Sequence, residues 1–324
     1  MNVVIVTLLS LFCYLSGFFV LFTPLPLFYA FVKRGNKDGL AAALLAITVL
    51  FFLSSFALAK VMPGSSLESS FSSGGVQFFS LAYYGFFAIL AYFLADGLRK
   101  PYNLQQWIGN SVFVSFGAMV GLFLLVEALG IVPIVSGMKA YLQFVVSELI
   151  ALNKAAGVDA RQLSVLAKHQ TEISTFALQI LPAVFFIFTL LCAVFNALLG
   201  SKVIKAGFKL PGRPELFRLS DQVVWLMIGA GIAFFLDAYL LHTSWIRVLA
   251  LNLLFALSAL YFLQGLAVIA YFLRKLRAHF FRTFIYVFIF LFFQTLGPLI
   301  VGLGIVDVWF NFRARMARKD KTIH

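Results

Sequence analysis

Long runs of apolar residues dominate the chain and alternate with short polar segments. Eight runs are long enough to cross a bilayer, whose hydrocarbon core takes about 20 helical residues. They also extend far beyond the length of a strand. Because lipid does not tolerate unpaired backbone groups, the pattern predicts an all-α, polytopic transmembrane helical bundle. The predicted spans are residues 3–22, 39–59, 76–97, 109–133, 175–199, 223–241, 246–272 and 283–310.

The composition agrees with a membrane protein and excludes an ordinary soluble domain. Of the 324 residues, 62% are hydrophobic and 11% are charged, whereas a soluble domain has about a quarter of its residues charged. Residues 1–324 are therefore predicted to form a single integral membrane domain. The net charge of +13 fits loops that face anionic lipid headgroups, and no nucleic-acid partner is expected.

Basic residues collect in every second loop, which predicts that these loops are cytoplasmic. The bacterial cytoplasmic (inner) membrane as the location is an expectation that the family resemblance given below implies. The C-terminal tail, 311–324, is also basic, yet eight single crossings would place it outside. A break in the last run at Gly297-Pro298 resolves this conflict and keeps the tail in the cytoplasm, because proline removes a backbone donor. The segment Thr23–Pro26 offers a second position for a break.

The connection 134–174 is too polar to span, but its apolar residues recur at helical spacing. We predict an extracytoplasmic amphipathic insertion that forms a lid or an interfacial hairpin.

Polar residues at membrane depth are costly unless they are paired, so they are the first candidates for function. At 1.5 Å of rise per residue, five such residues fall in one outer layer, and they could line a ligand pocket beneath the 134–174 segment. They are Glu127, Asp237, His242, Arg247 and Asn252. The structural alternative is an Asp237–Arg247 pair across a tight turn, with Glu127 as an interface residue and His242 as a loop residue. For Asp237 and Arg247 we favour the pair.

A second polar set lies near the inner face, where Gln264, Gln294 and Asp307 occupy the last two runs. Gln264 and Gln294 could bond to each other across the bundle. Asp96 is predicted to pair locally beside Arg99, and Asn196 to bond a neighbouring helix.

Small residues at four-residue spacing allow close helix packing, and they occur at Gly117 and Gly121 and at Ala193 and Ala197. We interpret both pairs as internal packing sites, and the alternative is a subunit interface. Cys13 and Cys192 are predicted to be small buried residues and not a disulfide.

No motif for nucleotide hydrolysis, zinc peptidase chemistry or a serine nucleophile occurs in the chain. The four histidines are scattered, so no metal site is predicted. We expect a protein that is not an enzyme and needs no cofactor.

The C-terminal third carries the residues Tyr261–Ala267 and the closing sequence Gly302–Arg313. With the early Pro24–Pro26 and Arg34-Gly35, they resemble the YybS-like family of predicted bacterial membrane proteins (domain of unknown function 2232). That family is grouped with the substrate-binding subunits of energy-coupling-factor transporters. The resemblance implies a small-molecule capture protein that is energised by a separate coupling subunit and ATPase.

The closing sequence also has a physical interpretation of its own. Asp307 and Arg313 end a membrane helix and can pair with each other, and Trp309 can anchor at the interface. We favour this structural role. The alternative is a surface for docking a partner, together with Arg274 and Lys275.

The leading functional hypothesis is therefore a transporter-like, substrate-binding membrane component that lacks its own ATPase. The alternative is a non-transporting scaffold that recruits partners through its basic cytoplasmic face.

Overall fold

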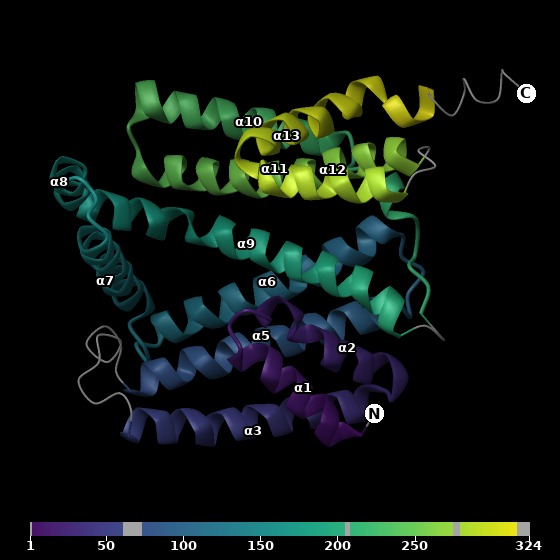
Figure 1. The fold of residues 1–324 in the computed structure, drawn as a ribbon, viewed down its shortest axis with the longest axis horizontal. Helices are drawn as coiled ribbons and strands as arrows, with labels where there is room; N and C mark the ends of the chain where they lie inside the picture. Colours follow the sequence, from purple (N-terminus) through teal and green to yellow (C-terminus); the bar gives the residue numbers. More distant parts are fainter. Residues whose placement is uncertain (1, 61–72, 205–207, 275–278, 316–324) are drawn as a thin grey trace, which may run out of the picture. The chain divides into compact units, whose positions relative to one another are not determined.

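The computed structural model describes residues 2–60, 73–204, 208–274 and 279–315, and all the regular structure among them is helical (Figure 1). The prediction of an all-α fold is therefore confirmed for these residues. The helices of the first part are α1 (Val3–Leu15), η1 (Val20–Phe22), α2 (Pro24–Lys33), α3 (Asn36–Lys60), α5 (Ser73–Gly97), α6 (Leu104–Ala128), α7 (Ile134–Ala155), α8 (Ala160–Lys168) and α9 (Gln170–Val203). They are followed by η2 (Pro214–Leu216), α10 (Gln222–Leu236), η3 (Asp237–Leu241), α11 (Ser244–Arg274), α12 (His279–Leu291) and α13 (Phe293–Phe310).

Eight of these helices are long and apolar enough to cross a membrane, which confirms the predicted number. They are α3, α5, α6, α7, α9, α10 with η3, α11 and α13. Two members of the predicted set differ. The run 3–22 is divided into short helices, and the segment Ile134–Ala155, predicted to be too polar, meets the criteria of length and composition.

The chain forms two compact units. Unit 1 contains residues 1–101 and 108–209, and unit 2 contains residues 102–107 and 210–324.

Unit 1 begins with a helical hairpin where the sequence predicts a single span. At 1.5 Å per residue, the 13 residues of α1 reach about 20 Å, which is short of a hydrocarbon core of about 30 Å. Gly17 has a φ of +67° just after the helix, a conformation that glycine adopts without steric cost. The chain then turns and re-enters helix at Pro24, a residue favoured in the first helical turn. The Ser10 hydroxyl donates to the Thr23 carbonyl at 3.0 Å and so joins α1 to the turn.

The long helices α3, α5, α6 and α9 run back and forth through unit 1. Arg99, after α5, donates to the Asn36 side chain and to the Phe31 carbonyl, both at 2.8 Å. These bonds hold the start of α3 and the ends of α2 and α5 together. We call this the basic end of unit 1; it carries Lys33, Arg34, Lys37, Arg99 and Lys100. Asp96 pairs with Lys100 at 2.6 Å, so its predicted local pairing is confirmed, although the partner is one residue further along.

Helices α7 and α8 lie at the opposite end of unit 1, where α6 ends and α9 begins (Figure 1). Val126, Val132 and Ile134 form a small core there. Gln170, the first residue of α9, donates to the Gln143 carbonyl in the middle of α7 at 3.0 Å. Because α7 touches the ends of its neighbours in this way, it lies across the end of the unit. An extracytoplasmic covering role for this segment stays a prediction.

The two small-residue pairs behave differently. Ala193 and Ala197 are buried, as expected for internal packing. Gly117 and Gly121 are exposed, and nothing lies within 4 Å of the position of a Cβ atom at either glycine. The prediction of internal packing at these glycines is therefore wrong for the described residues. Asn196 bonds to the Leu21 carbonyl at 2.8 Å, which confirms a contact with a neighbouring segment.

In unit 2 the run 283–310 is divided into α12 and α13, as expected, but the break lies at Phe292 and not at Gly297-Pro298. Pro298 lies inside α13. A proline ring clashes with the carbonyl of the residue four positions earlier, which here is Gln294 in the first turn. The disturbance therefore falls upstream of the proline.

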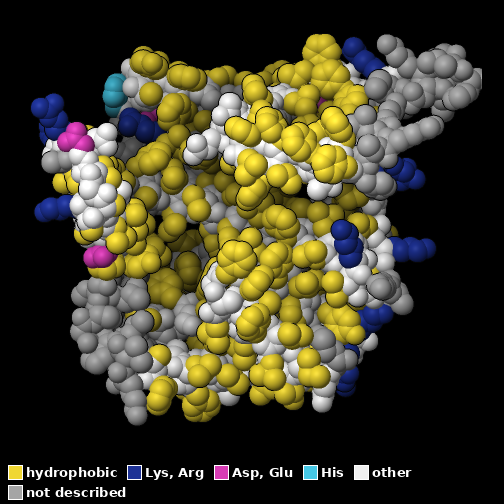
Figure 2. Space-filling view, viewed as in Figure 1, with side chains coloured by type: hydrophobic (Ala, Val, Ile, Leu, Met, Phe, Trp, Pro, Cys, Tyr) yellow, Lys and Arg dark blue, Asp and Glu magenta, His cyan; other side chains and the backbone are white. Residues whose placement is uncertain are grey.

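Hydrophobic side chains cover most of the visible surface, and Lys and Arg side chains gather at helix ends (Figure 2). Exposed large apolar residues occur along most of the long helices. Such surfaces are rare on soluble monomers but are expected where lipid surrounds a protein.

Candidate functional site

The predicted outer layer of polar residues is divided between the two units. Glu127 belongs to unit 1 and lies near the end of α6, where its carboxylate accepts hydrogen bonds from the backbone N–H groups of Ile134 and Val135. These N–H groups open α7 and have no partner within the helix. Glu127 therefore caps α7 and joins it to α6.

Asp237, in unit 2, is buried and surrounded by donors from the turn that follows it. Its carboxylate accepts from the Thr243 N–H at 2.7 Å, from the Thr243 hydroxyl at 2.6 Å and from Arg247 Nε at 3.1 Å. The favoured Asp237–Arg247 pair is therefore present, and Thr243 is a further partner that the sequence does not indicate. The π-helical turn η3 and the left-handed backbone of His242 (φ +53°) position these donors.

His242 has an exposed side chain, and its backbone N–H bonds to the Asp237 carbonyl. Asn252 donates to the Val248 carbonyl of its own helix at 2.8 Å. Each of the five predicted residues thus takes part in local structure, and ligand binding by them stays a prediction.

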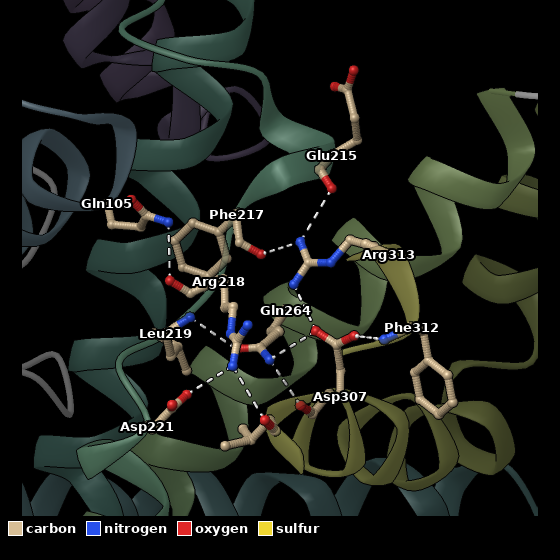
Figure 3. Close-up of polar contacts among 12 residues, drawn as sticks. Gln105, Glu215, Phe217, Arg218, Leu219, Asp221, Gln264, Asp307, Phe312 and Arg313 are labelled. Carbon is tan, nitrogen blue, oxygen red and sulfur yellow. Dashed lines mark hydrogen bonds and ion pairs between the residues drawn. The ribbon is translucent and has the colours of Figure 1, made fainter. Parts of the chain in front are cut away.

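A polar network in unit 2 centres on Asp307 (Figure 3). Arg313 Nη2 lies 2.6 Å from Asp307 Oδ2, and the two side chains are 7% and 0% exposed. The other oxygen, Oδ1, accepts from the Phe312 N–H at 3.1 Å. The left-handed Asn311 (φ +43°) ends α13 and turns the chain so that Arg313 points back at Asp307. The predicted local pair is therefore present.

Gln264 of α11 connects this ion pair to the connecting segment before α10. Its amide nitrogen donates to the Gly304 carbonyl at 3.0 Å and to Asp307 Oδ2 at 3.3 Å, and its oxygen accepts from the Leu219 N–H at 2.9 Å. Gln294 is exposed, so these partners replace the predicted Gln264–Gln294 bond.

Arg313 and Arg218 hold the same connecting segment in place (Figure 3). Arg313 Nη1 donates to the carbonyls of Glu215 at 3.2 Å and Phe217 at 2.7 Å. Arg218 donates to Asp221 at 2.9 Å and to the Val308 carbonyl at 3.2 Å. The segment between η2 and α10 is thus fixed by Arg218 of its own and by side chains from α11, α13 and the turn after α13.

Two glycines allow α11 and α13 to approach closely enough for this network. A methyl group on Gly304 would overlap the Tyr261 carbonyl oxygen, and one on Gly265 would overlap the Ile300 carbonyl oxygen. At these positions only hydrogen fits between the two backbones.

An open groove of about 470 Å³ lies beside the network. Its polar lining consists of Glu215, Arg274, Arg282, Thr283 and Tyr286, and Ala270 and Leu273 complete it. Arg274 forms an ion pair with Glu215. From the sequence, Arg274 and Arg282 are predicted only to mark a cytoplasmic loop, and Glu215, Thr283 and Tyr286 are not predicted to belong to a site. Nothing in the hydropathy pattern indicates that these segments meet.

The predicted docking residues differ in accessibility. Asp307 and Arg313 are buried against each other. They could affect a partner only indirectly, through the segment that they hold in place. Trp309 is 57% exposed, and Arg274 is also exposed. Lys275 lies outside the described residues. Docking by this set stays a prediction.

Among the described residues, no group of three or more His, Cys, Asp or Glu side chains is arranged to hold a metal ion. Cys13 and Cys192 are both free thiols, but only Cys192 is buried as predicted, whereas Cys13 is partly exposed.

Comparison with known proteins places the chain in a family. A search of curated proteins and a search of solved structures find no match. A family model described as "Predicted membrane protein (DUF2232)" matches residues 74–308. The match includes Gln264, Gly304 and Asp307 and covers more than two thirds of the chain. The chain therefore belongs to the DUF2232 family of predicted membrane proteins.

Proposed function

We propose that the protein is a membrane-embedded binding component that takes an anionic small molecule in the groove of unit 2 and has no ATPase of its own. The observation that carries this proposal is the convergence of two guanidinium groups and two hydroxyl groups on one open groove. Guanidinium groups recognise carboxylates and phosphates through paired hydrogen bonds. A volume of about 470 Å³ lies within the usual range for small-molecule sites.

The neighbouring network supports the proposal because it gives the groove a rigid wall. Arg313 fixes the Glu215 carbonyl, and Glu215 in turn holds Arg274. A site whose donors are already positioned loses less entropy when a ligand binds.

The basic loops favour a bacterial cytoplasmic membrane with the groove and the C-terminus on the cytoplasmic side. A transport role with a separate coupling subunit and ATPase belongs to this proposal, and the resemblance described above motivates it.

Replacing Arg282 with alanine is expected to weaken the binding of inorganic pyrophosphate by about 10- to 100-fold, because a charge-assisted hydrogen bond contributes about 1.5–3 kcal/mol. The measurement is the ligand-dependent rise in melting temperature of the full-length protein in detergent, which reports binding to the folded state. Arg315→Ala is the matched control. Arg315 is exposed in the same unit and lies over the Phe310 ring at 5.4 Å, outside the groove. Equal binding of pyrophosphate by the wild type and by Arg282→Ala would exclude the groove as the binding site.

The second candidate function is a scaffold that recruits an acidic cytoplasmic protein. It is favoured by the exposed end of α13, where Trp309, Phe310 and Arg315 combine two aromatic rings with a cation. Arg, Trp and Phe are enriched in protein interfaces. Combined Trp309→Ala and Arg315→Ala substitutions are expected to abolish recovery of a specific acidic partner in quantitative pull-downs, and Arg282→Ala to preserve it. If the partner is lost in Arg282→Ala and kept in the double variant, the result argues against the scaffold function.

A further inference from the structure

We propose that the ligand of the groove is an anionic phospholipid, whose phosphate group binds among Arg274, Arg282, Thr283 and Tyr286 and whose acyl chains lie along α12. This inference rests on the proposed function and names its ligand class. Three features of unit 2 lead to it: the position of α12, the direction of its groove-lining face and the charge of the groove.

The first feature is the arrangement of α12 and α13 as a hairpin with both ends beside the connecting segment. The start of α12 lines the groove with Glu215, and after α13 Arg313 bonds to the Glu215 and Phe217 carbonyls. With 13 residues, α12 reaches only about 20 Å. It therefore enters the apolar layer without crossing it, and the groove lies at the level where headgroups meet hydrocarbon.

The second feature is the continuation of the groove-lining face of α12 into an apolar surface. Thr283, Tyr286 and Phe290 are spaced three and four residues apart, so they lie on one helix face. Thr283 and Tyr286 line the groove, whereas Phe290 is 79% exposed. Phe290 stands about 6 Å further along the helix than Tyr286. A molecule that fits this face is polar at one end and apolar at the other.

The third feature is the charge of the groove, in which two arginines oppose one glutamate. A phosphodiester is an anion that can accept hydrogen bonds from guanidinium groups. Basic pockets between helix ends on the cytoplasmic side are a recurrent way of binding acidic lipids. A groove of about 470 Å³ holds a headgroup and leaves the acyl chains outside. Soluble phosphate shares the headgroup chemistry but makes no use of Phe290.

The Glu215–Arg274 ion pair predicts a second effect. Glu215 occupies Arg274, so its carboxylate competes with a phosphate for the same guanidinium. Glu215→Gln keeps the size of the side chain and its backbone carbonyl while removing the competing charge. This substitution is expected to increase lipid binding, which a loss of folding cannot imitate.

The test is native mass spectrometry of the full-length protein released from nanodiscs of phosphatidylglycerol and phosphatidylcholine. We expect retention of one phosphatidylglycerol. Its retention falls at least about tenfold in Arg282→Ala, falls severalfold in Phe290→Ser and rises in Glu215→Gln. Phe284→Ser is the matched control, because Phe284 is exposed on the other side of α12 and retention is expected to be unchanged.

The outcomes separate this inference from the proposed function. One outcome is that pyrophosphate binding depends on Arg282 while Phe290→Ser retains phosphatidylglycerol as well as the wild type does. This outcome supports an anion site and overturns the proposal that its ligand is a lipid. Equal retention of phosphatidylglycerol in wild type and in Arg282→Ala overturns the headgroup site. Absence of both ligands overturns both proposals.

Discussion

Replacing Arg313 with methionine is expected to lower the free energy of unfolding by about 3–5 kcal/mol, because the change leaves a buried carboxylate without its counter-charge. The Asp307 side chain is fully buried, and Arg313 lies 2.6 Å from it. The carbonyls of Glu215 and Phe217 lose a donor in the same substitution. Thermal or denaturant unfolding of the purified protein in detergent measures the loss, and hydrogen exchange at residues 213–219 is expected to accelerate.

Arg315→Met is the matched control for this experiment. It removes an exposed arginine two residues away, whose side chain lies over the Phe310 ring, and is expected to change stability by less than about 1 kcal/mol. The double substitution Arg313→Met with Asp307→Leu removes both charges and is expected to recover part of the loss. If Arg313→Met and Arg315→Met have the same small effect, the ion pair does not stabilise the fold.

Replacing Gly304 with alanine is expected to destabilise the protein by about 1–3 kcal/mol, a typical effect of overpacking a close contact. The added methyl group would overlap the Tyr261 carbonyl oxygen, and it would also lie close to the Gly265 backbone nitrogen. Because both obstacles are backbone atoms, no side chain can rotate away and the two helices must separate. The Gln264 bonds to Gly304 and Asp307 are then lengthened as well.

Gly302 offers the matched control, since it lies two residues earlier in α13 and nothing is within 4 Å of the position of its Cβ atom. Gly302→Ala is expected to be neutral or to stabilise by up to about 1 kcal/mol through helix propensity. Thermal unfolding of both variants, measured by differential scanning in the same detergent, gives the change in stability for each. A loss in Gly302→Ala equal to that in Gly304→Ala contradicts the assignment of a close helix crossing.

The helical fold can be predicted from the sequence because lipid leaves few alternatives for long apolar runs. Hydropathy does not show where such a run turns. The run 3–22 contains no charged residue, and its division follows from the backbone at Gly17 and the helix start at Pro24. The division of the run 283–310 was expected from Pro298, but its position depends on the helix turn that precedes the proline.

Contacts in the candidate site are predictable where they are local. Asp307 and Arg313 are six residues apart, and Asp237 and Arg247 join across one turn. Gln264 bonds to Leu219 over 45 positions, and Glu215 meets Arg274 over 59. Such pairs follow from how helices pack, which a hydropathy pattern does not encode.

Glycine spacing also failed to indicate the closest helix contact. Gly117 and Gly121 have the four-residue spacing typical of close packing, yet both are exposed among the described residues. Gly265 and Gly304 are single glycines on separate helices, and they form the tight crossing. Whether a small residue is needed depends on which surface faces the neighbour.

The helical hairpin α1–α2 has a consequence for biogenesis. Each of its helices is shorter than a bilayer span, so we expect the pair to insert together as one apolar unit and not as two successive crossings. Insertion of such a hairpin leaves both of its ends on the same side of the membrane.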